Sequence, residues 1–391
     1  ETKKMITRAG YSIEGTPNHH KWVMGKEGSN QMLKLEDIKE GDYVSIRRGM
    51  NCWSRNRNGG ISNFIYKNPR QRPADHGEEV DLSQMTTDLA YLMGLILGDG
   101  YVNFKQGKVV IAHSEEEKET IDFLLSQPHR LQFYRKDNIK QKTMCCSKKF
   151  TAFLEWYGFQ PGRVAKEKEI PRRLFNAPKW VVANFLSGLF DADGHARKRN
   201  GAVGYHSTSE KLIKQVQMLL LNFGIIARLA SNFVRPTERV KVESFVWSLS
   251  VSPVNALIFY DEIGFRLTRK QDRKENIPTI IREDGVPLQG KRVRRIIEGA
   301  FHKHKDFCGA SSIHKKGYVG YSKLKQFLET FSCSEAKEDL AILKRLVKEN
   351  YFWDQVKDIK DGYAETFDFV IPSNHCFVSN GFLSHNTPRG G

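Results

Sequence analysis

The sequence predicts an all-β domain that is divided between the two ends of the chain and interrupted by an α+β domain with two pseudo-symmetric α/β halves. Three observations lead to this expectation. Strand-like stretches occur near both ends, over Tyr11–Val23 and Asp42–Ile46 and again from Phe352 onward. Between about residues 84 and 278 the chain repeats a pattern of apolar helix, strand and amphipathic helix. A basic stretch with apolar residues at helical spacing, Leu340 to Val347, separates this repeat from the last strands.

Composition indicates a folded protein with a polyanionic partner. The 391 residues suit two or three domains, and 39% are hydrophobic. No apolar run approaches the roughly 18 residues that span a bilayer, and the first residues lack the apolar core of a signal peptide, so we expect no membrane partner. Lys and Arg exceed Asp and Glu by 62 to 45, which gives a net charge of +17 and favours nucleic acid as the partner. A merely basic enzyme is the alternative.

The cysteines indicate a reducing compartment. None of the six belongs to a C-x-x-C pair, so we expect an intracellular, cytoplasmic protein without a disulfide scaffold. One group, His302, His304, Cys308 and His314, has metal-ligand residue types, but its spacing matches no standard zinc pattern. A solvated basic helix and loop is the preferred interpretation.

The elements suggest domain boundaries in chain order. Residues 1–55 and 352–386 form the predicted all-β domain, and 56–83 a basic linker that includes Arg57, Arg70 and Arg72. Residues 84–279 form the duplicated domain, with strands expected at 108–112 and 245–251 and helices at 117–125 and 210–223. Residues 280–351 form a small basic helical insert, and a net charge of +7 over 286–349 predicts that it binds DNA phosphates.

Both halves of the repeat begin with an apolar helix that contains small residues four positions apart. Gly94 and Gly98 lie in the first helix, and Gly188 and Ala192 lie in the second. Small residues at this spacing let another helix backbone approach closely. We therefore expect the two helices to pack against each other.

Each of these helices ends in an acid and a glycine. Asp99 and Asp193 face the negative end of a helix dipole, at a cost of about 0.3–1 kcal/mol each. Side-by-side helices bring the two acids together, and a divalent cation that prefers oxygen ligands, such as Mg²⁺, stabilises such a pair. Beside a basic surface this arrangement suits phosphodiester hydrolysis. The alternative is that both acids are surface helix caps.

The stretches Leu92–Gly100 and Leu186–Gly194 resemble the two motifs of LAGLIDADG homing endonucleases, and the first departs from the pattern at Leu97 and Gly98. The resemblance implies two α/β half-domains whose curved antiparallel sheets straddle the major groove of double-stranded DNA. It also implies a monomer whose catalytic metal is bound by Asp99, Asp193 and the backbone of Gly98 and Ala192.

The family also places a lysine shortly before an Ile-Pro pair in each half. Lys168 and Lys274 occupy these positions, and the resemblance implies that they polarise the scissile phosphate or its water. Lys166 and Lys270 are neighbouring alternatives, and a solvated loop charge is a further alternative for each.

The end of the chain carries a different chemistry. The amide of Asn386 can attack its own backbone carbonyl and break the chain, and the adjacent His385 suits the accompanying proton transfer. Thr387 then offers a hydroxyl nucleophile directly after the break. The triplet alone is common in proteins, so its context decides its meaning.

That context resembles the splicing motifs of inteins. The stretches 367–381 and 381–386 resemble their last two motifs, and Thr16-Pro17-Asn18-His19 resembles their Thr-x-x-His motif, with His20 as an alternative histidine. The resemblance implies a horseshoe-like Hint β fold in the terminal segments. It implies that His19 protonates the upstream scissile amide, that Thr16 and Asn18 support its carbonyl, that Asp368 assists the branched intermediate, and that His375 assists Asn386.

The resemblance therefore covers nearly the whole chain. It implies an intein that excises itself by protein splicing, without a cofactor. It also implies that this intein carries a site-specific, Mg²⁺-dependent endonuclease, which cuts the host allele that lacks the intein. Glu1 is neither Cys nor Ser, so we expect a truncated start or a split intein with a separate N-terminal fragment. Residues 387–391 then belong to the flanking host protein, or extein, and Thr-Pro-Arg-Gly suggests a viral terminase or another ATPase. The alternatives are a DNA-binding protein with a decayed endonuclease and an RNA-binding maturase of the LAGLIDADG type.

Overall fold

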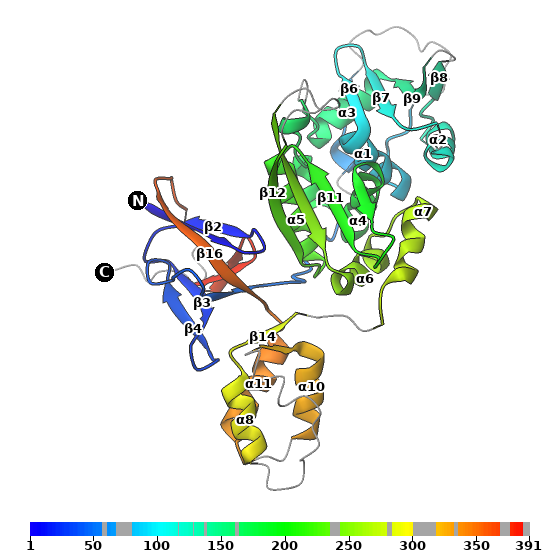
Figure 1. The fold of residues 1–391 in the computed structure, drawn as a ribbon. Helices are drawn as coiled ribbons and strands as arrows, with labels where there is room; N and C mark the ends of the chain where they lie inside the picture. Colours follow the sequence, from blue (N-terminus) through cyan, green and yellow to red (C-terminus); the bar gives the residue numbers. More distant parts are fainter. Residues whose placement is uncertain are drawn as a thin grey trace. The chain divides into compact units, whose positions relative to one another are not determined.

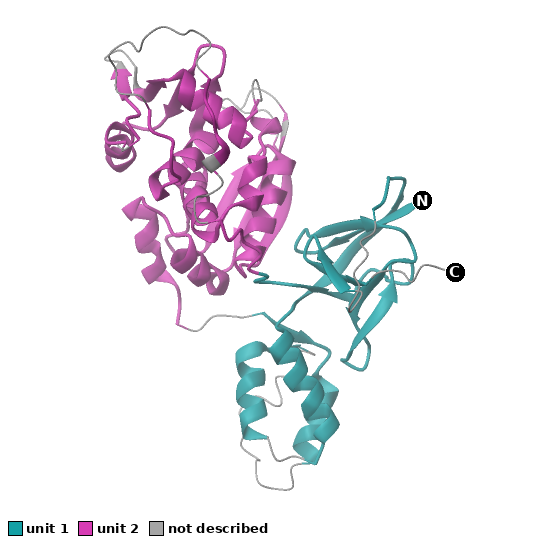
Figure 2. Cartoon of the chain, turned by 180° about the vertical axis from the view of Figure 1, so that it is seen from behind, with its two compact units in different colours: residues 1–50, 280–391 teal, residues 51–279 magenta. Residues whose placement is uncertain are grey.

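The computed structural model divides the chain into two compact units (Figure 2). One unit comprises residues 1–50 and 280–391, and the other comprises residues 51–279. The structure describes residues 1–56, 61–67, 80–115, 117–127, 129–136, 139–160, 164–234, 243–279, 284–299, 318–331, 335–367 and 376–385. Among these, no helix has the length and apolar character needed to cross a bilayer.

An eight-stranded sheet joins the two ends of the chain in the first unit. Its order is β17-β18-β3-β5-β16-β1-β2, and β4 pairs with β3. The strands are β1 Thr2–Thr7, β2 Ser12–Gly15, β3 His20–Met24, β4 Asn30–Lys34, β5 Tyr43–Ile46, β16 Phe352–Gly362, β17 Cys376–Ser379 and β18 Phe382–His385. The sequence predicted strands in this part of the chain but did not delimit β1, in which Thr2, Met5 and Thr7 are buried without a regular alternation.

Strand β16, from the C-terminal part of the chain, lies between two N-terminal strands, β5 and β1. It pairs with β5 from Phe352 opposite Ile46 to Gln355 opposite Tyr43, and its far end pairs with β1. The β17–β18 hairpin turns at Asn380 and Gly381, which have φ values of 49° and 84°. Positive φ at both central residues is the requirement of the two-residue turn that suits a twisted hairpin.

The basic insert belongs to the same unit and shares a core with the strands. It contains β14 Gly285–Pro287, α8 Gly290–Glu298, β15 Tyr318–Gly320, α10 Tyr321–Thr330 and α11 Lys337–Glu349. Buried Leu324, Phe327 and Leu343 pack in one cluster with Met24 and Trp353. The His302, His304, Cys308 and His314 group lies outside the described residues.

A buried arginine adds a polar connection between the insert and the strands. The Arg292 side chain is 3% exposed and donates to the backbone carbonyls of Glu27 and Gly28. It also pairs with Asp339 of α11 at 3.0 Å. The insert is therefore continuous with the β domain, because separating the two would leave a buried guanidinium without its carbonyl acceptors.

The second unit confirms the internal repeat (Figure 1). Its two four-stranded antiparallel sheets have the equivalent orders β6-β7-β9-β8 and β10-β11-β13-β12. The first half comprises α1 Thr87–Asp99, β6 Gly100–Asn103, β7 Lys108–Ala112, α2 Lys118–Leu125, β8 Phe133–Lys136, β9 Ile139–Cys146 and α3 Lys148–Tyr157. The second comprises α4 Lys179–Ala192, β10 Gly194–Ala196, β11 Val203–Ser207, α5 Glu210–Asn222, β12 Ala227–Val234, β13 Ser244–Val251, α6 Pro253–Glu262 and α7 Thr268–Gln271.

Short 3₁₀ turns complete this unit at Ile61–Asn63, Ala165–Glu167, Arg172–Asn176 and Asp272–Asn276. Some described residues of the expected linker are packed against this unit, although others are exposed. Ile61 is buried, and the Phe64 ring contacts the rings of Phe153 and Trp156. Cys52 N–H donates to Asn222 Oδ1 at 3.0 Å, so the chain joins the second unit soon after Met50. Arg57, Arg70 and Arg72 lie outside the described residues.

Helices α1 and α4 lie side by side, and glycine makes this approach possible. A Cβ atom on Gly94 would overlap the Phe185 carbonyl oxygen, and one on Gly188 would overlap the Tyr91 carbonyl oxygen. A Cβ on Gly98 would overlap the Cβ of Ala192. The predicted close packing of the two motif helices is confirmed.

The glycines that follow the acids lie where the two motif helices end, and Gly100 caps α1. Glycines at helix ends usually adopt a left-handed conformation. Gly100 is instead extended, with φ −91° and ψ 154°. A Cβ on Gly100 would overlap the Ile96 carbonyl oxygen, and one on Gly194 would lie 2.6 Å from the Phe190 carbonyl oxygen. Residue 100 must therefore be glycine because a Cβ atom would have no room there, and not because its backbone is left-handed.

Candidate functional site

The packing of α1 on α4 places the two motif acids at the same end of the helix pair. Asp99 is the last residue of α1, and Asp193 caps α4. A Cβ built on Gly98 would lie 3.5 Å from Asp193 Oδ2, so the Asp193 carboxylate lies beside the end of the first helix. Both acid side chains are exposed. The structure therefore brings the predicted acids together at a surface that a macromolecule can reach.

The surroundings of both acids favour their protonated forms. Loss of hydration and the negative charge of Asp193 raise the pKa of Asp99 to about 6. Loss of hydration also raises the pKa of Asp193, although Lys168, the Tyr205 hydroxyl and Lys270 oppose that effect. Because both side chains still reach solvent, screening reduces the energetic consequence of this crowding.

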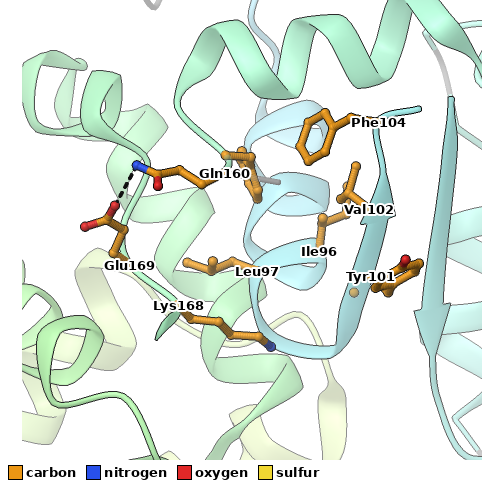
Figure 3. Close-up of a pocket in the computed structure, with 10 residues that line it drawn as sticks. Ile96, Leu97, Tyr101, Val102, Phe104, Gln160, Lys168 and Glu169 are labelled. Carbon is orange, nitrogen blue, oxygen red and sulfur yellow. Dashed lines mark hydrogen bonds between the residues drawn. The ribbon is translucent and has the colours of Figure 1, made fainter. Parts of the chain in front are cut away.

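Two lysines surround the acid pair. Lys168 Nζ donates to the Gly98 carbonyl oxygen at the end of α1, and Figure 3 shows its side chain running beneath the last turn of that helix. Lys270 Nζ donates to the carbonyl oxygens of Phe190, Asp191 and Gly194 at 2.9, 2.7 and 2.7 Å. The positive charge of each lysine lowers the pKa of both acids.

Lys274, the expected partner of Lys168, is not part of this group. Its ammonium pairs with Asp261 on α6, and its charge is absent from the influences on either acid. Lys270, which the sequence offered only as an alternative, takes the position in the second half. Lys166 is exposed in the 3₁₀ turn before Lys168. Position relative to the Ile-Pro pair was a poor guide, because α7 and a 3₁₀ turn change the direction of the chain between Lys270 and Ile277.

Sequence reasoning missed Asp191, which holds the second helix to its surroundings. This carboxylate is 3% exposed, and its Oδ2 accepts from the Tyr91 hydroxyl at 2.8 Å and from the Arg266 N–H at 2.8 Å. It also accepts from Leu267 N–H at 3.3 Å, directly before α7. Asp191 therefore fixes the segment that delivers Lys270. The acid was visible in the motif, but its burial was not.

Tyr205 is a second residue that the sequence did not single out. It lies on β11 opposite Gly194, is fully buried, and donates its hydroxyl to Asp193 Oδ2 at 3.4 Å. Aligning the two halves of the repeat would have found the position, because Ile111 lies opposite Gly100 in the first sheet. Asp193 thus has a hydrogen-bond donor in Tyr205, whereas Ile111, the equivalent residue in the first half, is apolar.

A divalent cation fits the donor set at the helix ends. Asp99 and Asp193 offer carboxylate oxygens, and Gly98 and Ala192 offer backbone carbonyls, which are the ligand types that Mg²⁺ and Mn²⁺ accept. The Gly98 carbonyl already accepts from Lys168 and retains a second lone pair. Within the described part of the chain, no group of three or more His, Cys, Asp or Glu side chains could hold a metal.

At the other unit, the structure describes only some of the expected splicing residues. Thr16 and His19 flank a turn in which the His19 N–H donates to the Thr16 carbonyl at 3.1 Å, with Asn18 between them. The His19 ring meets the Phe377 ring edge-on at 5.6 Å, and His385 lies opposite His20 in the β18–β3 pairing. Asp368, His375, Asn386 and Thr387 lie outside the described residues.

A buried lysine, which the sequence gave no reason to choose, lies beside this end of the chain. Lys21 is 2% exposed on β3, and its ammonium donates to Ser384 Oγ at 2.7 Å. Ser384 directly precedes His385. The N-terminal and C-terminal motifs thus meet along two paired strands.

Comparison with known families identifies the second helix and sheet. Residues 180–264, from α4 to the end of α6, match the family model described as a LAGLIDADG-like domain. The second half of the repeat is therefore similar to a LAGLIDADG-like domain. The matched segment carries Gly188, Asp193, Tyr205 and the whole second sheet.

The curated relatives have unrelated names. The glutamine–fructose-6-phosphate aminotransferase of Methanocaldococcus jannaschii is 22% identical over 83% of this chain and 29% of its own length. The tRNA-splicing ligase RtcB of Pyrococcus furiosus is 25% identical, and the replicative DNA helicase DnaB of Synechocystis is 24% identical; each match covers 98% of this chain and 43% of the relative. The chain therefore spans less than half the length of these relatives.

The solved structures that are similar to this chain include the homing endonuclease I-DmoI in complex with DNA and Mn. It is 19% identical, with a TM-score of 0.30, and the match covers 46% of this chain and 96% of that one. Full-length DUF199/WhiA from Thermatoga maritima is 15% identical, with a TM-score of 0.32, over 67% of this chain and 90% of that one.

The raised pKa of Asp99 predicts a pH-dependent stability in the absence of metal. The folded protein holds this proton up to about pH 6, whereas the unfolded chain releases it near the ordinary value of 3.8. Between these pH values the folded state binds more protons, so stability falls as pH rises. Asp99→Asn should therefore raise the free energy of unfolding by about 1 kcal/mol at pH 7.5, after allowance for solvent screening.

Thermal unfolding with a chelator, at pH 7.5 and pH 4, is the measurement. At pH 4 the folded state is protonated at this position and the unfolded state is partly protonated, so most of the difference between the variant and the parent should disappear. A stability difference between Asp99→Asn and the parent that is the same at both pH values would contradict the raised pKa of Asp99.

Proposed function

We propose that the second unit is a DNA endonuclease that hydrolyses phosphodiester bonds with the help of a divalent cation. The observation that carries the proposal is the exposed acid pair Asp99 and Asp193, held at one end of two packed helices between Lys168 and Lys270. Crowding two carboxylates at helix C-termini is unfavourable for folding, and such an arrangement suits a group that supplies positive charge.

Each residue of this group has a separate task. Asp99 and Asp193, with the Gly98 and Ala192 carbonyls, would hold the cation, which when bound supplies charge neutralisation and a more acidic water. Lys168 and Lys270, whose positive charges lower the pKa of both acids, would stabilise negative charge on a phosphate bound at the acid pair. In hydrolysis the oxygen of water bonds to phosphorus, one P–O ester bond breaks, and the leaving ester oxygen gains a proton.

Double-stranded DNA is the proposed partner. The net charge of +17 favours a polyanion, and the first unit by itself exposes Lys323, Lys325 and Lys344 on α10 and α11. A DNA-binding protein without cleavage is the second candidate. The departure of the first motif at Leu97 and Gly98, with Lys168 on the Gly98 carbonyl, is the observation that favours it.

Asp193→Asn separates these two functions. The substitution removes a carboxylate ligand, so Mg²⁺-dependent double-strand cutting should fall by at least about a hundredfold. DNA affinity should stay within about threefold, since phosphate contacts dominate binding. Cleavage assays and equilibrium binding on a selected duplex provide the readouts.

Asp122→Asn, on the exposed face of α2, is the matched control and should cut normally. Full cutting by Asp193→Asn would remove the acid pair from the mechanism. A parent chain that binds the duplex tightly but never cuts it would establish the binding-only candidate.

We further propose that the first unit is the splicing domain of an intein. The pairing of His385 with His20 across β18 and β3 supports this, because it brings the last motif beside the Thr-x-x-His turn. The relatives support it as well, since 98% of this chain aligns within an RNA ligase and a DNA helicase whose named activities have nothing in common. A segment shared by such proteins behaves as an inserted element.

The proposed chemistry at the end of the unit is cyclisation of Asn386. Its amide nitrogen attacks its own carbonyl carbon, a succinimide forms, and the bond to Thr387 breaks. The amide loses a proton, the departing amine of Thr387 gains one, and His385 transfers it. Lys21 anchors Ser384 from the buried side of the sheet and so limits the movement of His385.

Asn386→Ala tests this assignment. The parent chain should slowly lose the tail 387–391 on long incubation, and the variant should retain it, because alanine cannot form the succinimide. Mass spectrometry of the C-terminus is the measurement. DNA cutting by the variant should be unchanged, because the two activities belong to separate units. Tail loss that persists in Asn386→Ala would mean ordinary proteolysis.

A further inference from the structure

The two sheets of the second unit present equivalent rows of side chains with different chemistry. Strand pairing aligns Tyr101, Val110, Met144 and Tyr134 across the first sheet, and we call these residues the first row. It aligns His195, Gly204, Ser250 and Arg228 across the second sheet, and we call these residues the second row. Each row begins at the residue that follows Gly100 or Gly194, so both begin two residues beyond a motif acid.

Both rows lie on the sheet face opposite the core. Neighbouring residues along the strands, Ile111 in the first sheet and Tyr205 and Leu249 in the second, are buried. Side chains alternate between the two faces of a strand, so the rows point away from the helices. Tyr101 is 61% exposed, Tyr134 is 39% exposed, and Ser250 and Arg228 are also exposed.

The first row is aromatic and apolar. The two tyrosines flank the half-buried Val110 and the buried Met144, and Tyr134 uses its hydroxyl in a contact with Cys146 at 3.4 Å. Lys108 and Lys142 belong to the same face on either side of this row. An apolar strip between cations suits a groove with phosphate edges, whereas a purely apolar partner would leave the cations unmatched.

The second row is polar and is partly preorganised. The His195 ring covers Gly204, where a Cβ would lie 2.5 Å from His195 Nε2, and it stacks on His206 at 4.9 Å with a 10° interplanar angle. His206 Nδ1 in turn bonds Ser248 Oγ at 2.9 Å. Imidazole, hydroxyl and guanidinium groups therefore replace the aromatic and apolar groups of the first row.

These two chemistries match different features of the DNA major groove. Thymine alone presents a methyl group there, which apolar side chains contact, and arginine pairs most often with guanine O6 and N7. We propose that the first row reads thymine methyl groups in the half-site that it faces, and that Arg228 of the second row reads a guanine in the other half-site. The inference rests on the proposed DNA-binding function and specifies its target.

The test begins with the full chain and a library of random duplexes, without divalent cations so that no duplex is cut. The selected duplex is then remade with deoxyuridine in place of thymine, which removes only the methyl group. Uracil in the first half-site should weaken binding about fourfold for each contacted methyl. The same replacement in the other half-site should change binding by less than about 1.5-fold.

Matched variants assign the effect to the rows. Tyr101→Ser with Tyr134→Ser should abolish the sensitivity to uracil, whereas Arg228→Gln should keep it and reduce the guanine preference of the second half-site about tenfold. All three substituted residues are exposed, and thermal unfolding checks that both variants fold. Equal uracil effects in both half-sites, or full sensitivity in the tyrosine variant, would overturn the inference. Failure to select any duplex would instead overturn the proposed DNA function.

Discussion

The contact between the backbones of α1 and α4 is the constraint on which the candidate endonuclease site depends. Gly94 faces the Phe185 carbonyl and Gly188 faces the Tyr91 carbonyl, so each helix presents a glycine to the other. At this separation the charge of Asp193 helps to raise the pKa of Asp99, and the charges of Lys168 and Lys270 lower the pKa of both acids. A larger side chain at either glycine would force the helix ends apart.

The surrounding residues hold this geometry unequally in the two halves. Asp191 ties the second helix to Tyr91 of the first and to the segment before α7, and Tyr205 orients Asp193. Leu97 and Ile111 occupy the equivalent positions of the first half, where neither interaction is possible. The same inequality recurs in the two outward-facing rows. The two halves of the duplicated fold therefore differ in chemistry, which suits the proposed recognition of an asymmetric duplex.

Sequence periodicity and motifs predicted the repeat, the helix packing and the acid pair, because these depend on local spacing. They did not delimit β1 within the predicted β segment, since Lys3 and Lys4 obscure a strand that is stabilised by pairing with β16 from the other end of the chain. Lys270 was ranked below Lys274 because distance from a proline does not encode how α7 turns the chain. Buried polar residues such as Lys21, Asp191 and Arg292 were invisible for a related reason: burial is decided by segments distant in sequence.

The most direct test of the central claim is the affinity of the full chain for Mn²⁺, measured by electron paramagnetic resonance on the parent, Gly188→Ala and Gly15→Ala. Gly15 is the matched control, because a Cβ there would meet no atom closer than 4.0 Å. If backbone contact sets the distance between Asp99 and Asp193, Gly188→Ala should bind Mn²⁺ at least about tenfold more weakly, whereas Gly15→Ala should bind it normally. Unchanged Mn²⁺ affinity in a folded Gly188→Ala variant would contradict the account.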